Sequence, residues 1–504
     1  MSNNILPYCH VEGEMFSLPP LAQLMKKRIV VVTCRDAAML LKSSLSNRDL
    51  YSLESSIHAS FRPDEALLNP SYHWDGLIID EAAQAMESEA MLSVLVVAPP
   101  HAATDNPKGA PFVVMVGDQH QLGPRTASKD PAIQQSMFER LLRRPLYQDH
   151  PLARSRQSGG AVPRLTKDML PIIRPPFTDL IRNYRSHPTI IALPASLFYH
   201  DTLESEAAST DSLLSWSRFE TRPFPVLFID NCTPDEIERD GGGWFNVGEA
   251  DIALQHAASL LQEGLLAPHE ICIMSPFSAQ VRLLRLKARS PSVNVPGINI
   301  GPLEAFQGLE SRAVILCTTR TRDRFIDQDL ARGLGIINEP RRFNVALTRA
   351  KEGLIVIGSS KVLMQDENWA SFMAFCHRND AWKGDSDDLH WPHSSKIKTS
   401  RLEKQMQYRG MLEEEERKDR VRRHLGHLKL GMSEEEAFYE SAIAAQQEVG
   451  VPEDDEGADD DYHEEIGAAE LKVDPPGGDL DEKNNRISTL DPETEDYCLA
   501  YGLG

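Results

Sequence analysis

Short apolar segments alternate with helix-length segments along most of this chain, and this alternation restricts the possible folds more than any other feature. Seven such segments lie between residues 28 and 378: RIVVVTC, LIIDE, FVVMVGD, PVLFID, ICIMSP, RAVILCTT and GLIVIGS. Runs without a polar face are typical of strands that are covered on both sides of a parallel sheet. Because helices separate the strands, the sequence predicts doubly wound α/β domains.

Changes in composition divide the chain into four parts. Residues 143–178 are rich in Pro, Gly, Ser and Arg, which predicts a linker between two α/β domains at 1–142 and 179–379. The last part is residues 380–504, and after the break WKGDSDDLHWPHSS at 382–395 we expect no further strands. Residues 400–430 predict a charged, exposed helix suited to a protein partner, and the acidic end is too poor in apolar residues to fold, so we expect it to be disordered.

The net charge is concentrated at one end of the chain. Of a total of −22, residues 451–504 carry 18 acidic against three basic side chains, which leaves only −7 for residues 1–450. A nucleic-acid partner is therefore compatible with the composition, since local charge matters more than its sum.

Cysteine usage and hydropathy point to the cell interior. None of the seven cysteines forms a Cys-x-x-Cys pair, which argues against a disulfide framework or a zinc site. No apolar run approaches the ~20 residues of a membrane span, and the N-terminus lacks a signal-peptide pattern. We expect a soluble protein without membrane contact.

Two apolar segments end in polar groups that suit nucleotide hydrolysis. In LIIDEAAQ, Asp80 and Glu81 follow directly after the apolar run. In nucleotide hydrolases such acids hold Mg²⁺ and position the attacking water. VVMVGDQHQLGP delivers Asp118 and Gln121, and a Gln can bond a terminal phosphate without adding charge. Taken singly, each pattern is more often an ordinary strand end followed by a turn.

Basic residues gather in two further stretches. In LIRNYRSHP, Tyr184 can stack on a base and Arg185 can bind a phosphate in bidentate fashion. In RRFNVALTRAK, helical spacing predicts that residues 344, 348 and 351 share a face. Arg349 would then meet the charge of a transferring phosphoryl group, although a solvated basic helix is an equal alternative.

Two stretches have residues suited to close approach of a ligand. ICIMSPFSAQ ends a strand at Ser275 and Pro276 and opens a helix, a natural position for a backbone phosphate. In AFQGLE, Gly308 permits close approach to the backbone, and Glu310 can accept from a ribose hydroxyl.

The order of DEAAQ, GDQHQLGP, NYRSHP, MSPFSAQ, AFQGLE and NVALTRAK resembles that of the superfamily 1 helicases, over residues 28–378. It is most similar to the RNA helicase group that includes the nonsense-mediated-decay helicase and Armitage. The resemblance implies two RecA-like P-loop NTPase domains, with ATP between them and single-stranded RNA across their top. DNA stays open as a substrate, because a track of stacking and phosphate contacts tolerates either sugar.

The resemblance also implies roles at the nucleotide. Asp80 would bind Mg²⁺, Glu81 would activate water and Gln121 would sense the γ-phosphate. Arg185 and Arg349 would act as arginine fingers.

Further roles concern the base, the ribose and the nucleic acid. Tyr184 would stack near adenine, and Glu310, beside Gly308, would contact ribose. The nucleic-acid track would be lined by Thr33, Ser275 and Pro276.

One motif of the family is missing from the sequence. A phosphate-binding loop reads Gly-x-x-x-x-Gly-Lys-Ser/Thr, and no Gly-Lys dipeptide occurs in these 504 residues. Since the family places this loop upstream, we expect the first RecA-like domain to be N-terminally truncated, with an uncovered apolar face in residues 1–142.

Two hypotheses about function follow, and whether the chain is an enzyme stays open between them. It is an ATP-dependent RNA helicase or translocase, or it is a non-hydrolysing RNA-binding or scaffold protein. Either would be cytoplasmic, with RNA granules included and the nucleus as an alternative, and protein partners would bind the charged C-terminal region.

Overall fold

The computed structural model describes thirteen stretches of the chain, and every structural statement below concerns them. They are residues 8–12, 15–65, 72–100, 110–128, 130–157, 167, 176–219, 224–239, 243–291, 293–332, 335–384, 399–429 and 497–499. The chain forms two compact units, Met1–Val31 with Glu414–Tyr501 and Val32–Glu413 with Gly502–Gly504.

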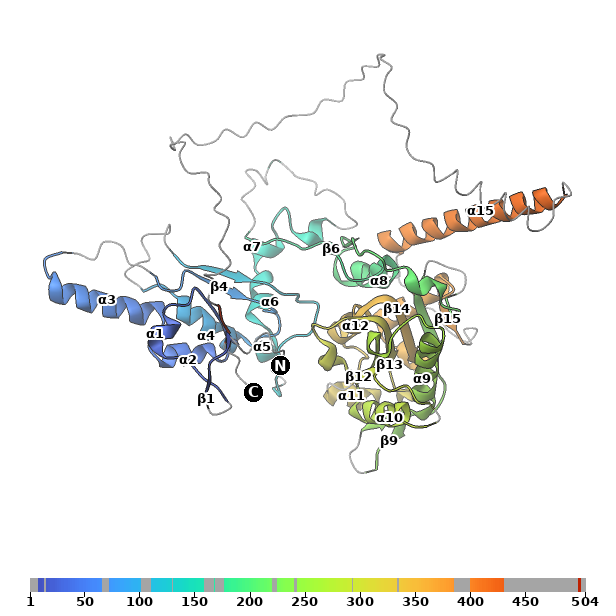
Figure 1. Ribbon diagram of the computed structural model, residues 1–504, viewed down its shortest axis with the longest axis horizontal. Helices are drawn as coiled ribbons and strands as arrows, with labels where there is room; N and C mark the ends of the chain where they lie inside the picture. The colour runs from blue at the N-terminus through green and yellow to red at the C-terminus, as the bar shows by residue number, and fades with distance from the viewer. Residues whose placement is uncertain are drawn as a thin grey trace, which may run out of the picture. The chain divides into compact units, whose positions relative to one another are not determined.

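A six-stranded parallel sheet is the centre of the larger unit (Figure 1). Every pair of neighbouring strands runs parallel, from one edge of the sheet to the other. In spatial order the strands are β12 (Asn299–Pro302), β11 (Ile271–Ser275), β13 (Ser311–Cys317), β14 (Ala350–Gly358), β8 (Val226–Asp230) and β15 (Trp382–Lys383).

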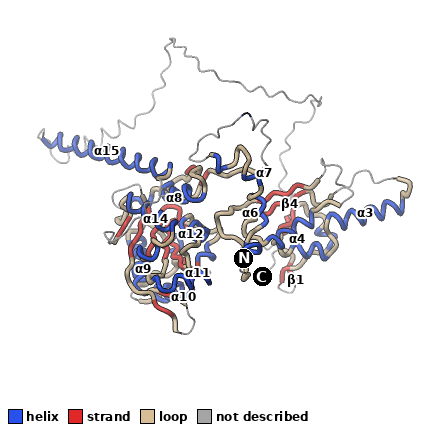
Figure 2. The backbone as a smooth tube through the Cα atoms, turned by 180° about the vertical axis from the view of Figure 1, so that it is seen from behind, coloured by secondary structure: helices blue, strands red, loops and turns tan. Residues whose placement is uncertain are grey.

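Helices cover both faces of this sheet, and Figure 2 shows its strands running among them. One face packs against α9 (Val247–Gln262) and α10 (Ser278–Ala288). The other packs against α8 (Pro188–Phe198), α12 (Pro340–Leu347) and α14 (Glu367–Arg378). Each face has its own cluster of buried apolar side chains, which explains why the strands have no polar face.

Local sequence sets where the helices around the sheet begin. Asn246 caps α9 by accepting from the Glu249 N–H at 2.9 Å, and Asp366 caps α14 in the same way. Helix α8 starts with Pro188, whose fixed φ suits the first helical position.

The preceding part of the larger unit contains a smaller sheet. Strands β4 (Gly76–Ile79) and β5 (Phe112–Met115) form a parallel pair, accompanied by α2 (Ala37–Lys42), α3 (Asn47–Phe61), α4 (Glu87–Val97) and α6 (Met137–Leu142). Ile78 is 67% exposed and Phe112 is 56% exposed. These strands therefore show the uncovered apolar side chains that the sequence predicted.

The remaining described elements are short. They are β1 (Val11–Glu12), β2 (Met15–Phe16), α1 (Leu21–Leu24), α5 (Pro131–Gln134), α7 (Pro145–Gln148), β6 (Arg182–Asn183), β7 (Glu204–Ser205), β9 (Glu236–Ile237), β10 (Trp244–Phe245), α11 (Ile326–Arg332) and α13 (Ser360–Leu363). None of the helices in the described residues has the length and apolar character to cross a membrane.

All seven apolar segments form strands, but the expectation that strands cease after the break at 382–395 is wrong, because one strand lies beyond it. Strand β15 lies at the start of the break itself, as the edge of the large sheet. In the smaller unit β16 (Tyr497–Leu499) pairs in parallel with β3 (Ile29–Val31), the strand of RIVVVTC. Apart from β16, the acidic end lies outside the described residues, as does most of 158–175 in the predicted linker.

The charged helix of residues 400–430 is present as α15 (Arg401–Lys429), but its first turns are not exposed. Leu402 and Met406 are buried in the same apolar cluster as α8 and α14. Glu403 accepts from the Arg378 guanidinium at 3.0 Å. Apolar residues at positions i and i+4 thus pack the start of this helix onto the sheet domain.

Candidate functional site

The acidic pair lies where β4 ends, in a backbone conformation that side chains rarely adopt. Glu81 has a φ of 49°, in the left-handed region, and the next residue is held by a bond from the Ala82 N–H to the Val116 carbonyl at 2.8 Å. Gln84 donates to the Glu81 carboxylate at 2.8 Å and orients it. Strain of this kind is concentrated at functional sites.

The GDQHQ loop approaches this turn closely. A Cβ at Gly117 would lie 3.0 Å from the Ala83 nitrogen, so a side chain at this position would push the two strand ends apart. Glycine therefore keeps Asp118 and Gln121 beside the acidic pair. The Gln121 side-chain amide donates to Asp118 Oδ2 at 3.1 Å.

Arg349 lies directly after α12, and here one expectation is wrong. The helix ends at Leu347, and Lys351 belongs to strand β14, so residues 344, 348 and 351 do not share a helical face. The chain turns at Thr348 and enters the sheet, which positions Arg349 at the start of a strand.

Arg349 is a buried cation next to the GDQHQ loop. It is 3% exposed, and its Nη2 donates to Gln121 Oε1 at 3.2 Å. Nη1 donates to the Leu309 carbonyl at 3.2 Å, and Nε has no partner among the described residues.

The charge on Arg349 is costly in these surroundings. Burial first, and the nearby Arg185 second, lower its pKa to about 10, although Glu81 and Glu310 act in the opposite direction. In the described part of the chain no carboxylate forms an ion pair with it. The site is therefore short of negative charge where Arg349 and Gln121 meet.

Arg185 is held by a carboxylate in this structure. Its Nε donates to Glu310 Oε2 at 2.6 Å, and Lys351 Nζ donates to the other oxygen at 3.0 Å. Both bonds hold the pKa of Glu310 below its usual range. Lys351 is thus a third cation at the site, one to which the motifs assigned no role.

The neighbours of this cluster are open to solvent. Gly308 has a φ of 73°, and nothing lies within 4 Å of the Cβ position, so glycine is required by the backbone and leaves space above it. Tyr184 is 67% exposed, and its ring is available for stacking.

The predicted nucleic-acid residues differ in accessibility. Ser275 is fully buried, and its hydroxyl lies 3.0 Å from that of Thr319. Pro276 is half-buried, and Thr33 is exposed and donates to Asp36 Oδ2 at 2.6 Å. No contact among the described residues joins Thr33 to Ser275 or Pro276.

Tyr199 is a residue of this site that the motifs did not reveal. Its hydroxyl donates to Asp118 Oδ2 at 2.7 Å and accepts from the Asn344 amide at 2.8 Å. The Asn344 amide also donates to the His120 carbonyl at 2.9 Å. The one signal in the sequence is a tyrosine directly after an apolar helix, which most often indicates packing.

The Asp80 carboxylate fits a magnesium ion shared with a ligand. It is exposed, one oxygen accepts from the Glu81 N–H at 2.9 Å, and the other has no hydrogen-bond donor in the described stretches. No group of three or more His, Cys, Asp or Glu there forms a complete metal site. Mg²⁺ often binds in this way, through one carboxylate together with water and phosphate oxygens.

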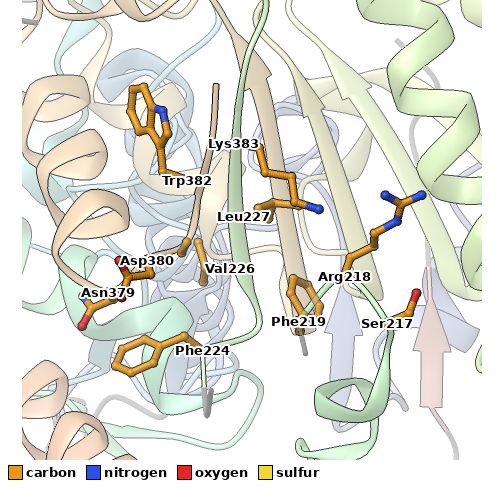
Figure 3. Close-up of a pocket in the computed structure, with 11 residues that line it drawn as sticks. Ser217, Arg218, Phe219, Phe224, Val226, Leu227, Asn379, Asp380, Trp382 and Lys383 are labelled. Atoms are coloured by element: carbon orange, nitrogen blue, oxygen red, sulfur yellow. The ribbon is translucent and has the colours of Figure 1, made fainter. Parts of the chain in front are cut away.

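A cavity of about 340 Å³ lies elsewhere, at the β8–β15 edge of the sheet (Figure 3). Figure 3 shows Trp382 and Arg218 on opposite sides of this view. None of the predicted site residues lines it.

Comparison with known proteins bears on this arrangement. The AAA_12 family model, described as an AAA domain, matches residues 164–361. The putative helicase MOV-10 of Gallus gallus is 30% identical over 62% of this chain and 33% of its own length. The ATP-dependent helicase upf1 of Schizosaccharomyces pombe is 29% identical over 60% of this chain and 29% of its own length. The probable RNA helicase armi of Drosophila melanogaster is 30% identical over 62% of this chain and 26% of its own length.

The chain is therefore a relative of the superfamily 1 helicases. The resemblance predicted from the motifs, to the RNA helicase group that includes the nonsense-mediated-decay helicase and Armitage, is confirmed. The chain spans about a third or less of the length of these curated relatives. Among solved structures, one titled as the structure of PRRSV helicase aligns with 68% of this chain and 55% of its own, at a TM-score of 0.26 and 12% identity.

Proposed function

We propose that this chain is part of an ATP-dependent RNA helicase or translocase that hydrolyses ATP between two RecA-like domains. The observation that carries the proposal is Arg349, a buried guanidinium that faces Gln121 without a carboxylate partner in the described residues. A terminal phosphate supplies the missing negative charge, and burial strengthens its attraction to the arginine.

The acidic pair supplies the remaining chemistry of the proposal. Asp80 would hold Mg²⁺, which neutralises phosphate charge when bound. Glu81, already oriented by Gln84 at 2.8 Å, accepts a proton from the attacking water. In this scheme Glu310 releases Arg185 when it takes a ribose hydroxyl, and Arg185 then reaches the phosphates.

The RNA would cross the carboxyl ends of the strands. Thr33 and Pro276 supply accessible contacts, and Ser275 supports the loop through Thr319. Single-stranded RNA is the proposed substrate because one of the relatives named above, armi of Drosophila melanogaster, is titled a probable RNA helicase, and DNA is the alternative. The boundaries 1–142, 143–178, 179–379 and 380–504, protein partners at the charged C-terminal region and a cytoplasmic location belong to the same proposal.

A second function is favoured by one observation. Without a Gly-Lys dipeptide, this sequence lacks the loop that cradles phosphates in P-loop enzymes. The alternative is therefore an RNA-binding or scaffold protein that does not hydrolyse ATP.

The experiment that separates the two functions measures phosphate release from Mg-ATP by the full chain, with and without single-stranded RNA. The motor predicts RNA-stimulated release that falls at least about a hundredfold in Glu81→Gln, because the general base is lost. Glu54→Gln, at an exposed glutamate of α3, is the matched control. If the parent chain binds RNA but releases no phosphate, the result contradicts ATP hydrolysis by this sequence and supports the alternative.

A further inference from the structure

The side chains of Asp118, Gln121, Tyr199 and Asn344 form one hydrogen-bonded network. This network joins the GDQHQ loop to α8 and α12. Asp118 Oδ2 accepts from Tyr199 at 2.7 Å and from Gln121 at 3.1 Å. The Tyr199 hydroxyl accepts in turn from Asn344, which also bonds the His120 carbonyl. Tyr199 is therefore more than a packing residue, since its hydroxyl is fully used.

The Gln121 amide has a defined orientation in this network. Its nitrogen faces Asp118 and its oxygen faces Arg349. A phosphate oxygen can only accept hydrogen bonds, so it needs the nitrogen side of this amide. The amide nitrogen has two N–H groups and Asp118 holds one of them, so Gln121 must turn away from Asp118 before a phosphate can take both.

Turning has a cost that depends on Tyr199. When the Gln121 nitrogen leaves, Asp118 Oδ2 loses one of its two donors, and a partly buried carboxylate without a donor is unfavourable. Tyr199 keeps its bond to the same oxygen at 2.7 Å, so the carboxylate stays satisfied. Burial and Asp118 both raise the pKa of Tyr199, so the hydroxyl keeps its proton and remains a donor.

We propose that Tyr199 is a positioning residue that sets how readily the Gln121 amide turns from Asp118 toward a phosphate, through the carboxylate that both side chains share. The inference rests on the proposed function for its purpose, since the phosphate is that of ATP.

The first test uses the full chain without nucleotide, with ¹⁵N-glutamine labelling. The Gln121 side-chain signal is assigned by its loss in Gln121→Glu. In Tyr199→Phe the Gln121 nitrogen becomes the only side-chain donor to Asp118 Oδ2, so its protons should exchange with water roughly threefold more slowly. Tyr147→Phe, at a half-buried tyrosine beside Phe177, is the matched control and should leave the signal unmoved.

Asp118→Asn separates positioning from general loosening of the fold. This variant removes the charged acceptor, so the Gln121 protons should exchange faster, and adding Tyr199→Phe should then change the rate little. A Gln121 signal that is the same in Tyr199→Phe and in the parent overturns the inference. So does faster exchange in Tyr199→Phe, which is the result of mere loosening.

A second readout involves the terminal phosphate. Tyr199→Phe should weaken binding of a non-hydrolysable Mg-ATP analogue by about tenfold while Mg-ADP binding is unchanged, because only the former needs the turned amide. Loss of both affinities to the same extent would contradict the inference. A parent chain that binds neither nucleotide contradicts the proposed function, and the amide signals still decide the role of Tyr199.

Discussion

At the scale of single residues, the site is defined by side chains whose charge or backbone is unfavourable in isolation. Arg349 is buried without an ion pair in the described residues, and Glu81 has a φ of 49°. Neither condition stabilises the fold by itself. Both are understandable if a phosphate and a water molecule occupy the space between them.

Replacing Arg349 tests this view of the charge. If Arg349 stabilises charge on a transferring phosphoryl group, Arg349→Ala should lower steady-state ATP turnover by about a thousandfold. Arg289→Ala, at an exposed arginine after α10, is the matched control. Turnover within twofold of the parent in Arg349→Ala would show that the role is wrongly assigned.

His187 provides a pH dependence at the same scale. It caps α8, its Nδ1 accepts from the Thr189 N–H at 3.2 Å, and its Nε2 lies 3.2 Å from Asp211 Oδ1. Burial lowers its pKa to about 4 from the ordinary value of 6.5, so the folded state keeps the ring neutral while the unfolded chain takes up a proton. This contribution is fully present above pH 6.5 and is lost as pH falls toward 4.

The free energy of unfolding should therefore fall across this window by up to about 3 kcal/mol more in the parent than in His187→Asn. Asparagine is also a favourable helix cap, so the variant removes the titration and keeps the capping bond. Urea unfolding between pH 4 and 7 measures the difference. Parallel pH profiles for the two proteins would contradict the prediction.

At the scale of elements, α15 shows how a charged helix combines two environments. Leu402 and Met406 are buried against the sheet domain, whereas Met411, one to two turns on, is 65% exposed. Arg409 continues the docked face, since it donates to Asp211 at 2.7 Å. A count of charged residues predicts an exposed helix, but two apolar residues four positions apart are enough to dock its start.

Docking of α15 can be measured. Leu402→Ala should lower the free energy of unfolding by about 3 kcal/mol, because it leaves a cavity in a buried cluster. Met411→Ala on the same helix should stay within about 0.5 kcal/mol. Equal effects of the two variants in urea unfolding would show that the helix does not pack as described.

At the scale of the whole molecule, helices support the six-stranded sheet of the larger unit more fully than the β4–β5 sheet. The six-stranded sheet is covered on both faces by helices, and its four central strands are almost entirely buried. The β4–β5 pair leaves Ile78, Phe112 and Val113 exposed. Two strands with an open apolar side are marginally stable on their own.

Limited proteolysis tests this difference on the full chain. Cleavage should occur within residues 1–142 well before residues 179–379, because local opening requires less free energy where few apolar contacts are lost. Mass spectrometry of the first products identifies the sites. Equal resistance of the two regions would mean that the first is as well supported as the second.

Much of this architecture is readable from the sequence. Apolar runs such as those of β13 and β14 predict buried strands because the pattern reflects burial directly. The short edge strand β15 and the docking of α15 were not predictable, since both depend on a partner surface that local sequence does not describe. The helix predicted to continue through Lys351 ends at Leu347 because pairing in the sheet outweighs local helical spacing.

The sequence by itself determined which groups the site contains: two acids, a glutamine and the arginines at fixed places in the motifs, together with the family they indicate. Only the tertiary structure decided which of these groups are buried and which hydrogen-bond partners they have. Glu310 holds Arg185, Ser275 is buried, and Tyr199 shares Asp118 with Gln121. The physical reason is that residue type is local, whereas burial and hydrogen bonding arise between residues far apart in the chain.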